Sequence, residues 1–464
     1  MIPTRRRCFA AASRLPRVCA CLLIAGLGGC ATYKPLSLGH PRAAASVAHL
    51  SVPAASMPTP VLAGYPFNPV DGLDATEVAM LAVADNPQLK VRRDDLGVAK
   101  AQAFAAGLLP DPQLNLGVDF PGSRASGLTT GYTLGLSEDL GALLLRSGRK
   151  QVAECQVRQV NLDLLWAEWQ TVAQARLLFD KVRTLRARKA RLDSEQTALT
   201  PLANHIQKAL QAGNMTYATA NSGLDAMASV RQQSATTTTS LHKASAQLRL
   251  LLGLTAEAPL DLTGAFYLPQ PNRSQLKTAL ASLPRRRPDL LALQAGYQAQ
   301  NGRLRQAILA QFPAITLGFN RARDTGNVTS NGFTLGITLP LFNRNRGQIA
   351  IARASRQKLK DAYTARLLAT RSDMHRLQAD LATLQKLSTA ASAHAKKLDA
   401  SLMAASDAWQ RRLLDWPTYL AIRSAALAAD LQSLDVREQM AEQAIALTTL
   451  LGNTHFNPAQ VTTP

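Results

Sequence analysis

The sequence repeats itself at a nearly constant distance of about 200 residues, and this repeat is the feature that most constrains the fold. The matching segments are PQL at Pro87 with PDL at Pro288 and GYTLGL at Gly131 with GFTLGI at Gly332, both 201 residues apart, and LG at Leu252 with LG at Leu451, 199 apart. A single match of this length means little, but a constant offset over many residues indicates a duplicated unit. The chain is therefore expected to contain two copies of one structural unit.

Each copy of the unit predicts a helix, two strands and a polar loop in the same order. The first helix has about 20 residues and ends before Pro112 or Pro313, because proline pushes the preceding residue out of helical backbone angles. The predicted strands are residues 113–120 and 131–139 in the first copy, and 314–321 and 332–340 in the second, separated by polar loops at 121–130 and 322–331. Apolar Tyr132, Leu134 and Leu136 alternate with small polar residues, as in the wall of a membrane β-barrel.

The number of strands indicates an oligomer. Four strands cannot close a barrel, and a barrel in a membrane must close to leave no unpaired edge. Several chains would therefore have to contribute strands; two copies would supply eight and three would supply twelve. A soluble sandwich would give the same local pattern, but it would need more strands than the sequence offers.

Long helices fill most of the rest. Residues 348–414 contain neither glycine nor proline, so one continuous helix there would span about 100 Å. Met374, Leu377 and Leu381 begin a stripe at three-four spacing that is typical of a coiled-coil seam. The matching run at 149–200 meets Pro201, where a kink is expected. Each run is followed by a turn and a return helix, which predicts two antiparallel hairpins.

The first residues predict an export signal. Five arginines precede an apolar run over residues 18–27, and the chain then reads Leu27-Gly28-Gly29-Cys30, which resembles a bacterial lipobox. Residues 1–29 are thus expected to be removed and Cys30 to carry lipid, with an extended tail over 30–71. The net charge of +21 falls to +16 when these arginines leave. The basic residues are scattered and form no recognition motif, so we expect no nucleic-acid partner and favour acidic lipopolysaccharide, anionic cargo or an acidic protein.

Residues for catalysis or metal binding are not found in a usable pattern. Cys155 is the only cysteine left after Cys30, so no intramolecular disulfide is expected. The seven histidines form no close-spaced ligand pair, and Asp373 and His375 point apart on a helix. We find no nucleophile elbow and no phosphate loop of the Walker type. The expectation is a protein that is not an enzyme and that uses no metal or cofactor.

The whole pattern resembles the TolC family of outer-membrane efflux channel lipoproteins. The segments that carry the resemblance are Asn86-Pro87-Gln88-Leu89, Arg287-Pro288-Asp289-Leu290 and the basic stretch LPLFNRNRG from Leu339 to Gly347; GLLPDP at Gly107 is similar to the heavy-metal branch. The resemblance implies a mainly α protein with a membrane β-barrel part: a homotrimer with a twelve-stranded barrel above a twelve-helix periplasmic α-barrel. Such channels are implied to be passive and to dock a periplasmic adaptor and an inner-membrane pump of the RND type.

The resemblance also divides the chain. The first efflux repeat is expected over 72–253, with strands at 113–139 and a helical hairpin at 146–252. The second is expected over 287–453, with strands at 314–340 and a hairpin at 347–451. An equatorial connector would occupy 254–286, and a tail would follow at 454–464.

Three groups of residues are candidates for function. At the strand-to-helix junction, Pro340 would end the strand, with Phe342, Arg344, Arg346 and Gly347 at the membrane boundary or tunnel rim. The adaptor-docking tips would be formed by Gly213, Asn214 and Thr216 in the first hairpin and by Pro417 and Thr418 in the second, where Pro417 replaces the usual glycine. Leu420 and Arg423 stand where relatives close the channel with acidic residues. Arg423 is therefore a candidate gate residue; the alternative is an exposed, solvated arginine.

The leading function is an exit channel for drugs or metal ions in a tripartite efflux system, located in the bacterial outer membrane with contacts to membrane lipid. An alternative with the same fold is the exit duct of a type I protein secretion system. An alternative of another class is a lipid-anchored periplasmic coiled-coil scaffold.

Overall fold

The structure is a computed structural model of the 464-residue chain. It describes residues 33–39, 43–48, 50–53, 57–123, 126–264 and 273–452. The chain divides into two compact units, Met1–Ala43 and Ala44–Pro464, and every element below belongs to the second unit. The predicted signal, Cys30 and the tail at 454–464 lie outside the described residues.

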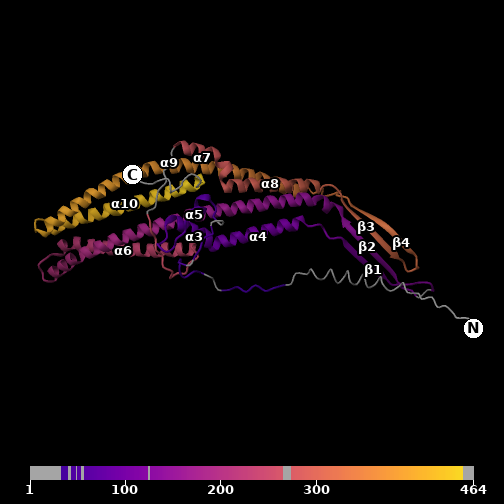
Figure 1. Ribbon diagram of the computed structural model, residues 1–464, viewed down its shortest axis with the longest axis horizontal. Coiled ribbons are helices and arrows are strands. Elements are labelled where there is room, and N and C mark those ends of the chain that lie inside the picture. Colours follow the sequence, from indigo (N-terminus) through magenta and orange to yellow (C-terminus); the bar gives the residue numbers. More distant parts are fainter. Residues whose placement is uncertain are drawn as a thin grey trace, which may run out of the picture. The chain divides into compact units, whose positions relative to one another are not determined.

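The elements of the second unit follow the duplicated order that the sequence predicts (Figure 1). The first copy consists of α3 (Ala75–Asp85), α4 (Pro87–Gly107), β1 (Gln113–Asp119), β2 (Gly131–Asp139), α5 (Leu140–Gln211) and α6 (Tyr217–Leu251). The second consists of α8 (Pro288–Leu309), β3 (Ala314–Arg323), β4 (Thr329–Thr338), α9 (Arg346–Gln410) and α10 (Trp416–Leu451). Two shorter helices, α2 (Pro60–Ala63) and α7 (Arg273–Arg286), precede the two copies.

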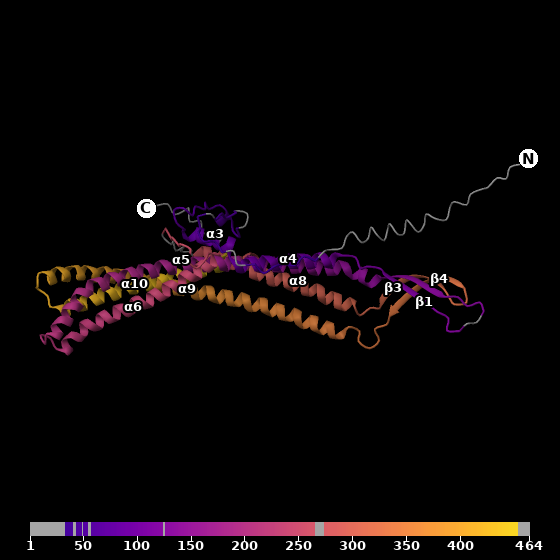
Figure 2. The same ribbon diagram turned by 90° about the horizontal axis from the view of Figure 1, so that it is seen from below.

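The four strands form one antiparallel sheet in the order β1-β2-β3-β4. The sheet lies at one end of the second unit and the turns of the two helical hairpins lie at the other (Figure 2). The predicted strand at 332–340 is misplaced: β4 begins at Thr329 and ends at Thr338, two residues before Pro340. The reason is a tight turn, in which the Asp324 N–H donates to the Val328 carbonyl at 3.1 Å and pairing can resume at once.

Helix α5 runs as one helix of 72 residues through Pro201, so the proline does not interrupt the helix as the sequence suggests. Its buried side chains recur every seven residues on both sides of Pro201, at Leu164, Thr171, Leu178, Leu185, Leu192, Leu199 and Ile206. A strict seven-residue stripe keeps one face of a helix against its neighbours. Packing of this stripe thus outweighs the single hydrogen bond that the proline removes.

Helix α9 is shorter than its glycine-free sequence predicts. It ends at Gln410 rather than Leu414, because Arg412 adopts a left-handed backbone with a φ of 59°. The predicted coiled-coil stripe is only partly covered by the rest of the chain: Met374 and Leu377 are buried, whereas Leu387 is 42% exposed. The uncovered part of the stripe is available to another chain.

The largest apolar core surrounds α3 where the long hairpin of the first copy passes it. Val172, Phe179 and Val182 of α5 and Leu248 of α6 are buried there with almost the whole of α3. Leu260, from the segment that follows α6, closes the same core. Among the described helices, none combines the length and the apolar character that crossing a membrane would require.

Candidate functional site

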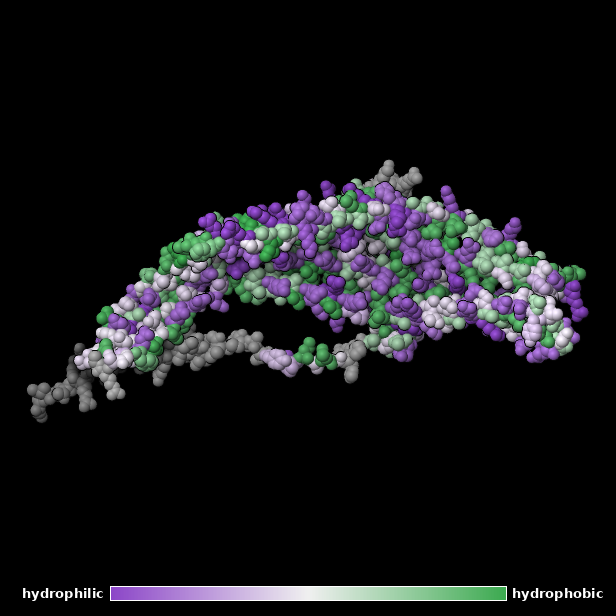
Figure 3. All heavy atoms as spheres, turned by 180° about the vertical axis from the view of Figure 1, so that it is seen from behind, coloured by the Kyte–Doolittle hydropathy of each residue, from purple (hydrophilic) through white to green (hydrophobic). Residues whose placement is uncertain are grey.

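One face of the sheet is apolar and exposed. Its members alternate along each strand and meet across the ladder: Leu114, Leu116 and Val118; Tyr132, Leu134 and Leu136; Ile315, Leu317 and Phe319; Phe333, Leu335 and Ile337. Phe319 and Phe333 form an edge-to-face pair with ring centres 5.5 Å apart. Phe333 is 84% exposed, and the strand-bearing end carries green hydrophobic residues among white ones (Figure 3). So large an exposed apolar surface must be covered by lipid or by another protein chain.

The opposite face carries small side chains. Asn115, Thr133, Ser137, Thr316 and Thr334 lie there, with glycines at 117, 135, 318, 332 and 336. The charged groups on this face of the described strands are Asp119 and Asp139, at the two ends. In the described part of the sheet, β1 and β4 each pair on one side alone. An apolar outer face, a small polar inner face and two open edges are the properties of a barrel segment.

The first junction between strand and helix contains no loop. Strand β2 ends at Asp139 and α5 begins at Leu140, with the Asp139 carboxylate accepting a hydrogen bond from the Ala142 N–H at 3.0 Å. A carboxylate at this position satisfies a free N–H group at the helix start. One turn later, Arg146 Nε donates to the carbonyl of Gly107 at 2.7 Å. Arg146 thus ties the new helix to the last residue of α4.

The second junction is a loop of residues 339–345. The Leu341 N–H donates to the Leu339 carbonyl at 2.9 Å, so the chain turns at Pro340 after pairing has already ended. Arg344 and Asn345 both have left-handed backbones, with φ of 45° and 52°. Asn345 Nδ2 donates to the carbonyl of Ala307 at 2.8 Å, in the last turn of α8.

The remaining junction residues surround this loop. Phe342 is 90% exposed. Its carbonyl accepts a hydrogen bond from Arg346 Nη2 at 3.3 Å. A Cβ added at Gly347 would meet no atom within 4 Å. The predicted junction residues therefore lie together, but Pro340 marks the turn rather than the strand end.

The first hairpin tip is a tight glycine turn. Gly213 has a φ of 71°, and the Asn214 N–H donates to the carbonyl of Ala209 at 2.9 Å. This left-handed residue with a six-residue hydrogen bond is a common helix end. Thr216 then caps α6, its hydroxyl accepting from the Thr219 N–H at 3.3 Å. Gly213, Asn214 and Thr216 are all exposed.

The second tip has the same construction, which corrects the expectation that Pro417 replaces the glycine. The left-handed position is held by Arg412, and the Leu413 N–H donates to the carbonyl of Ala408 at 2.8 Å. Pro417 lies in the first turn of α10, where its missing N–H would have no partner in any case. Pro417 and Thr418 are exposed beside the tip.

Leu420 is buried and the Arg423 side chain is largely covered, which overturns the alternative of an exposed, solvated Arg423. Arg423 Nε contacts Glu195 Oε1 of α5 at 2.8 Å, and the two side chains are 14% and 8% exposed. Arg423 Nη1 also donates to the Tyr419 hydroxyl at 2.8 Å. Burial lowers the pKa of Arg423, but the hydrogen bonds and charges of Glu195 and Tyr419 outweigh this effect and raise the pKa overall.

An apolar cluster surrounds this ion pair. Leu420 packs with Leu192 and Leu199 of α5 and with Met227 of α6. A Cβ added at Gly223 of α6 would lie 2.4 Å from Ile206 and 3.1 Å from the Trp416 ring. The absence of a side chain at Gly223 therefore lets the start of α10 approach α6, and the two hairpins are joined near their tips.

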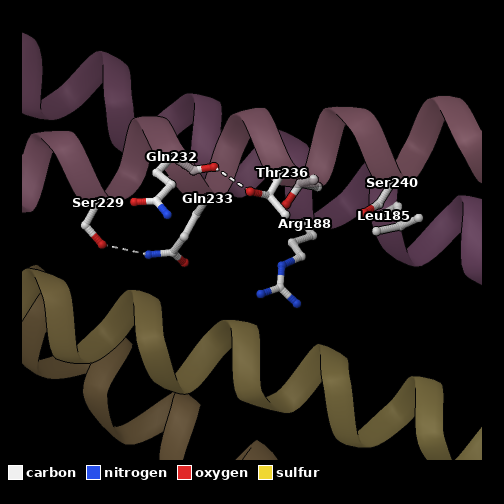
Figure 4. A pocket seen from close by; sticks show the side chains of 8 residues that line it. Leu185, Arg188, Ser229, Gln232, Gln233, Thr236 and Ser240 are labelled. Atoms are coloured by element: carbon white, nitrogen blue, oxygen red, sulfur yellow. Dashed lines mark hydrogen bonds between the residues drawn. The ribbon is translucent and has the colours of Figure 1, made fainter.

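Farther from the tips, α5 and α6 border a hollow of about 440 Å³ that is lined mostly by polar side chains. Its lining includes Arg188, Gln232, Gln233 and Thr236 (Figure 4). Arg188 Nη1 contacts Asp435 of α10 at 2.5 Å. Apart from Leu185, the side chains that line the hollow are polar.

Two partly buried carboxylates, Asp180 and Glu438, lie near this level. Burial, followed by the negative charge of Glu438, raises the pKa of Asp180 to about 6. Burial likewise raises the pKa of Glu438 on α10. In the part of the chain that the structure describes, no group of three His, Cys, Asp or Glu residues could hold a metal ion.

Sequence reasoning missed Glu195 and Arg412. Glu195 is 228 residues from Arg423, and nothing in the local sequence connects them. Arg412 could have been found, because the 199-residue offset that aligns Leu252 with Leu451 also aligns Gly213 with Arg412.

These features define a class of protein whose chain contributes a segment of barrel wall and two long helical hairpins. Solved structures agree. A membrane protein from Pseudomonas aeruginosa matches with a TM-score of 0.70 at 19% identity, covering 88% of this chain and 95% of that one. The Neisseria gonorrhoeae MtrE outer membrane channel matches with a TM-score of 0.68 at 17% identity, covering 91% and 97%. CusC, described by its transmembrane channel formation, matches with 0.66 at 19% identity, covering 86% and 97%.

Residues 279–453 match the family model for outer membrane efflux proteins. No curated protein matches the sequence. At these identities the solved structures establish the fold of the chain, and the family-model match covers its second repeat. Residues 279–453 therefore form an outer membrane efflux protein repeat, and the protein is located in the outer membrane with an extension into the periplasm.

Proposed function

We propose that this protein is the passive exit channel of a tripartite efflux system and works as a homotrimer. The observation that carries the proposal is the amphipathic four-stranded sheet, which has open edges and continues into two helical hairpins. Two copies would make eight strands, whose interior is filled by side chains. Three copies would make twelve strands and leave a lumen, bordered here by glycine, serine, threonine and asparagine.

Reconstitution tests this proposal. Purified protein in planar bilayers is expected to give stepwise conductance, and its mass by native mass spectrometry should be three times that of the mature chain. A monomer without conductance would contradict it. In cells, deletion of the gene should increase sensitivity to drugs or to metal ions, and the affected compounds would identify the class of cargo.

Lipid attachment at Cys30 is part of the proposal. Its support is the order of arginines, apolar run and small residues before the cysteine. Metabolic labelling with a palmitate analogue should mark the wild type and leave Cys30→Ser unmarked. Labelling that persists in the variant would place the lipid elsewhere.

The two tips are proposed to dock a periplasmic adaptor, which would connect the channel to an inner-membrane pump of the RND type. Gly213, Asn214 and Thr216 at one tip and Pro417 and Thr418 at the other are exposed, and no described residue covers them. Gly213→Trp should prevent efflux and crosslinking to the adaptor while trimers still form. The matched control is Gly122→Trp, in the loop between β1 and β2, which should leave both intact.

The Arg423–Glu195 pair is proposed to hold the periplasmic entrance narrow by fastening α10 to α5. Removing one partner of a buried pair leaves an uncompensated charge and is strongly unfavourable. Arg423→Ala and Glu195→Ala should each raise conductance and shift ion selectivity. The charge swap Arg423→Glu with Glu195→Arg should restore much of the wild-type behaviour. Unchanged gating in both single variants would reject the gate role.

A further inference from the structure

The outward, apolar face of the sheet carries its charges in an ordered way. Within the four described strands, Glu138 lies on this face at the end nearest the helices, opposite Leu317. Arg321 and Arg323 lie on the same face at the loop end, opposite Leu134 and Tyr132. The face is therefore apolar over its middle, acidic at the helix end and basic at the loop end.

Arg323 is held in place by its surroundings. Its guanidinium lies over the Tyr132 ring, 5.2 Å from the ring centre, and Nη2 donates to the Thr130 carbonyl at 3.0 Å. Its Nε is shielded from solvent and has no hydrogen-bond partner. Ordering of this kind lowers the entropy that binding a ligand would otherwise cost.

Arg321 is exposed, and no hydrogen bond or ion pair to a described residue engages it. Two residues apart on one strand face, the two arginines have Cα atoms about 7 Å apart. The neighbouring carboxylates do not neutralise them. Asp324 Oδ1 accepts from the Val328 N–H at 2.9 Å within its own turn, and Asp119 belongs to the inner face.

Because the helices extend into the periplasm, the loop end of the sheet faces the outer leaflet. The chemistry found there is the phosphorylated disaccharide of lipopolysaccharide, above a layer of acyl chains. Arginine binds phosphate through paired, charge-assisted hydrogen bonds. Directly below Arg321 on the same face lie Phe319 and Leu317, which suit acyl chains.

We propose that Arg321 and Arg323 form a binding site for the phosphates of outer-leaflet lipopolysaccharide, with the acyl chains lying against the apolar face below. The site rests on the outer-membrane orientation of the proposed channel, but not on conduction. Failure of conduction with intact lipid binding would therefore reject the channel and leave this site standing.

The test uses full-length protein in detergent and lipid A with two phosphates. Binding is measured by native mass spectrometry, with dephosphorylated lipid A as the comparison ligand. Arg321→Gln with Arg323→Gln should weaken binding of the phosphorylated lipid by about tenfold or more, as loss of charged hydrogen bonds implies. The control, Arg356→Gln, removes an exposed arginine of α9 away from the sheet and should bind as the wild type.

Three results would overturn the proposal: equal binding of the two lipids by the wild type, unchanged binding by the double variant, or equal binding of phosphatidylglycerol. The first comparison needs no variant, so it decides the question even if the double variant fails to assemble. Conductance of the same preparations reports separately on the channel.

Discussion

The two strand-to-helix junctions occupy equivalent places in the duplicated unit but differ in construction. In the first, α5 follows β2 without a loop; in the second, residues 339–345 separate β4 from α9. Yet Arg146 and Asn345, 199 residues apart, both donate to a carbonyl near the end of the preceding short helix. The duplication thus preserved the tie between helices and allowed the connection itself to change.

The reason lies in the residues at the junctions. Leu140 to Leu145 contain leucine, alanine and one glycine, which allow a helix capped by Asp139 to start at once. The second junction has Pro340 and asparagines at 343 and 345, which favour turns and left-handed backbone. The first copy of the unit therefore has a rigid junction, and the second copy has a jointed one.

Insertion of one alanine should give the largest difference in effect between the two junctions. Between Asp139 and Leu140, an added residue would rotate α5 by about 100° relative to the sheet and misdirect its buried stripe. Trimers should then be lost from outer-membrane fractions. The same insertion after Leu341 should be absorbed by the loop and leave most trimers. Equal loss at both sites would show that the second loop is not a joint.

Loss of the helix ties should have a smaller effect. Arg146→Ala should destabilise the protein by about 2 kcal/mol, because a charge-assisted hydrogen bond to Gly107 is lost. Asn345→Gly keeps the left-handed backbone available and loses one neutral hydrogen bond, so about 1 kcal/mol is expected. Thermal unfolding followed by circular dichroism measures both. A larger loss of stability in Asn345→Gly than in Arg146→Ala would show that Asn345 makes the stronger tie.

The tips extend the comparison, since glycine and arginine hold the same left-handed position. Gly213→Ala should destabilise by about 1 kcal/mol, and Arg412→Gly should stabilise by up to about 1 kcal/mol, because a side chain strains this conformation. Chemical unfolding of both variants gives the sign of each change in the free energy of unfolding. Destabilisation by Arg412→Gly would mean that the arginine side chain makes a contact that offsets its strained backbone.

The smallest effect is expected at Asp180, whose counterpart 199 residues later is Ala379. The pKa of Asp180 is raised from 3.8 to about 6 in the folded protein. Its contribution to stability is therefore present below about pH 4 and lost as the pH rises through 6. Asp180→Ala should flatten this dependence and raise the melting temperature at pH 7 by on the order of 1 °C. Glu438→Gln should act in the same direction by removing the opposing charge, and an unchanged pH profile in both variants would contradict the coupling.

The repeat and the alternation of side chains predicted the element order, all four strands and both hairpins, because these patterns record periodic burial along the chain. They did not predict the continuity of α5 at Pro201, where packing of distant helices outweighs a local preference. They also missed the burial of Arg423, because its partner Glu195 comes from another hairpin. Properties that depend on which helices become neighbours could not be predicted from the sequence.

The small side chains on the inner face of the sheet have a consequence for traffic through the proposed channel. Glycine, serine, threonine and asparagine dominate the described middle of that wall, and its carboxylates stand at the ends. Such a wall offers a passing molecule few groups to hold it, so residence within the barrel should be brief and similar for unlike molecules. Discrimination between cargoes would then have to occur before they reach the barrel.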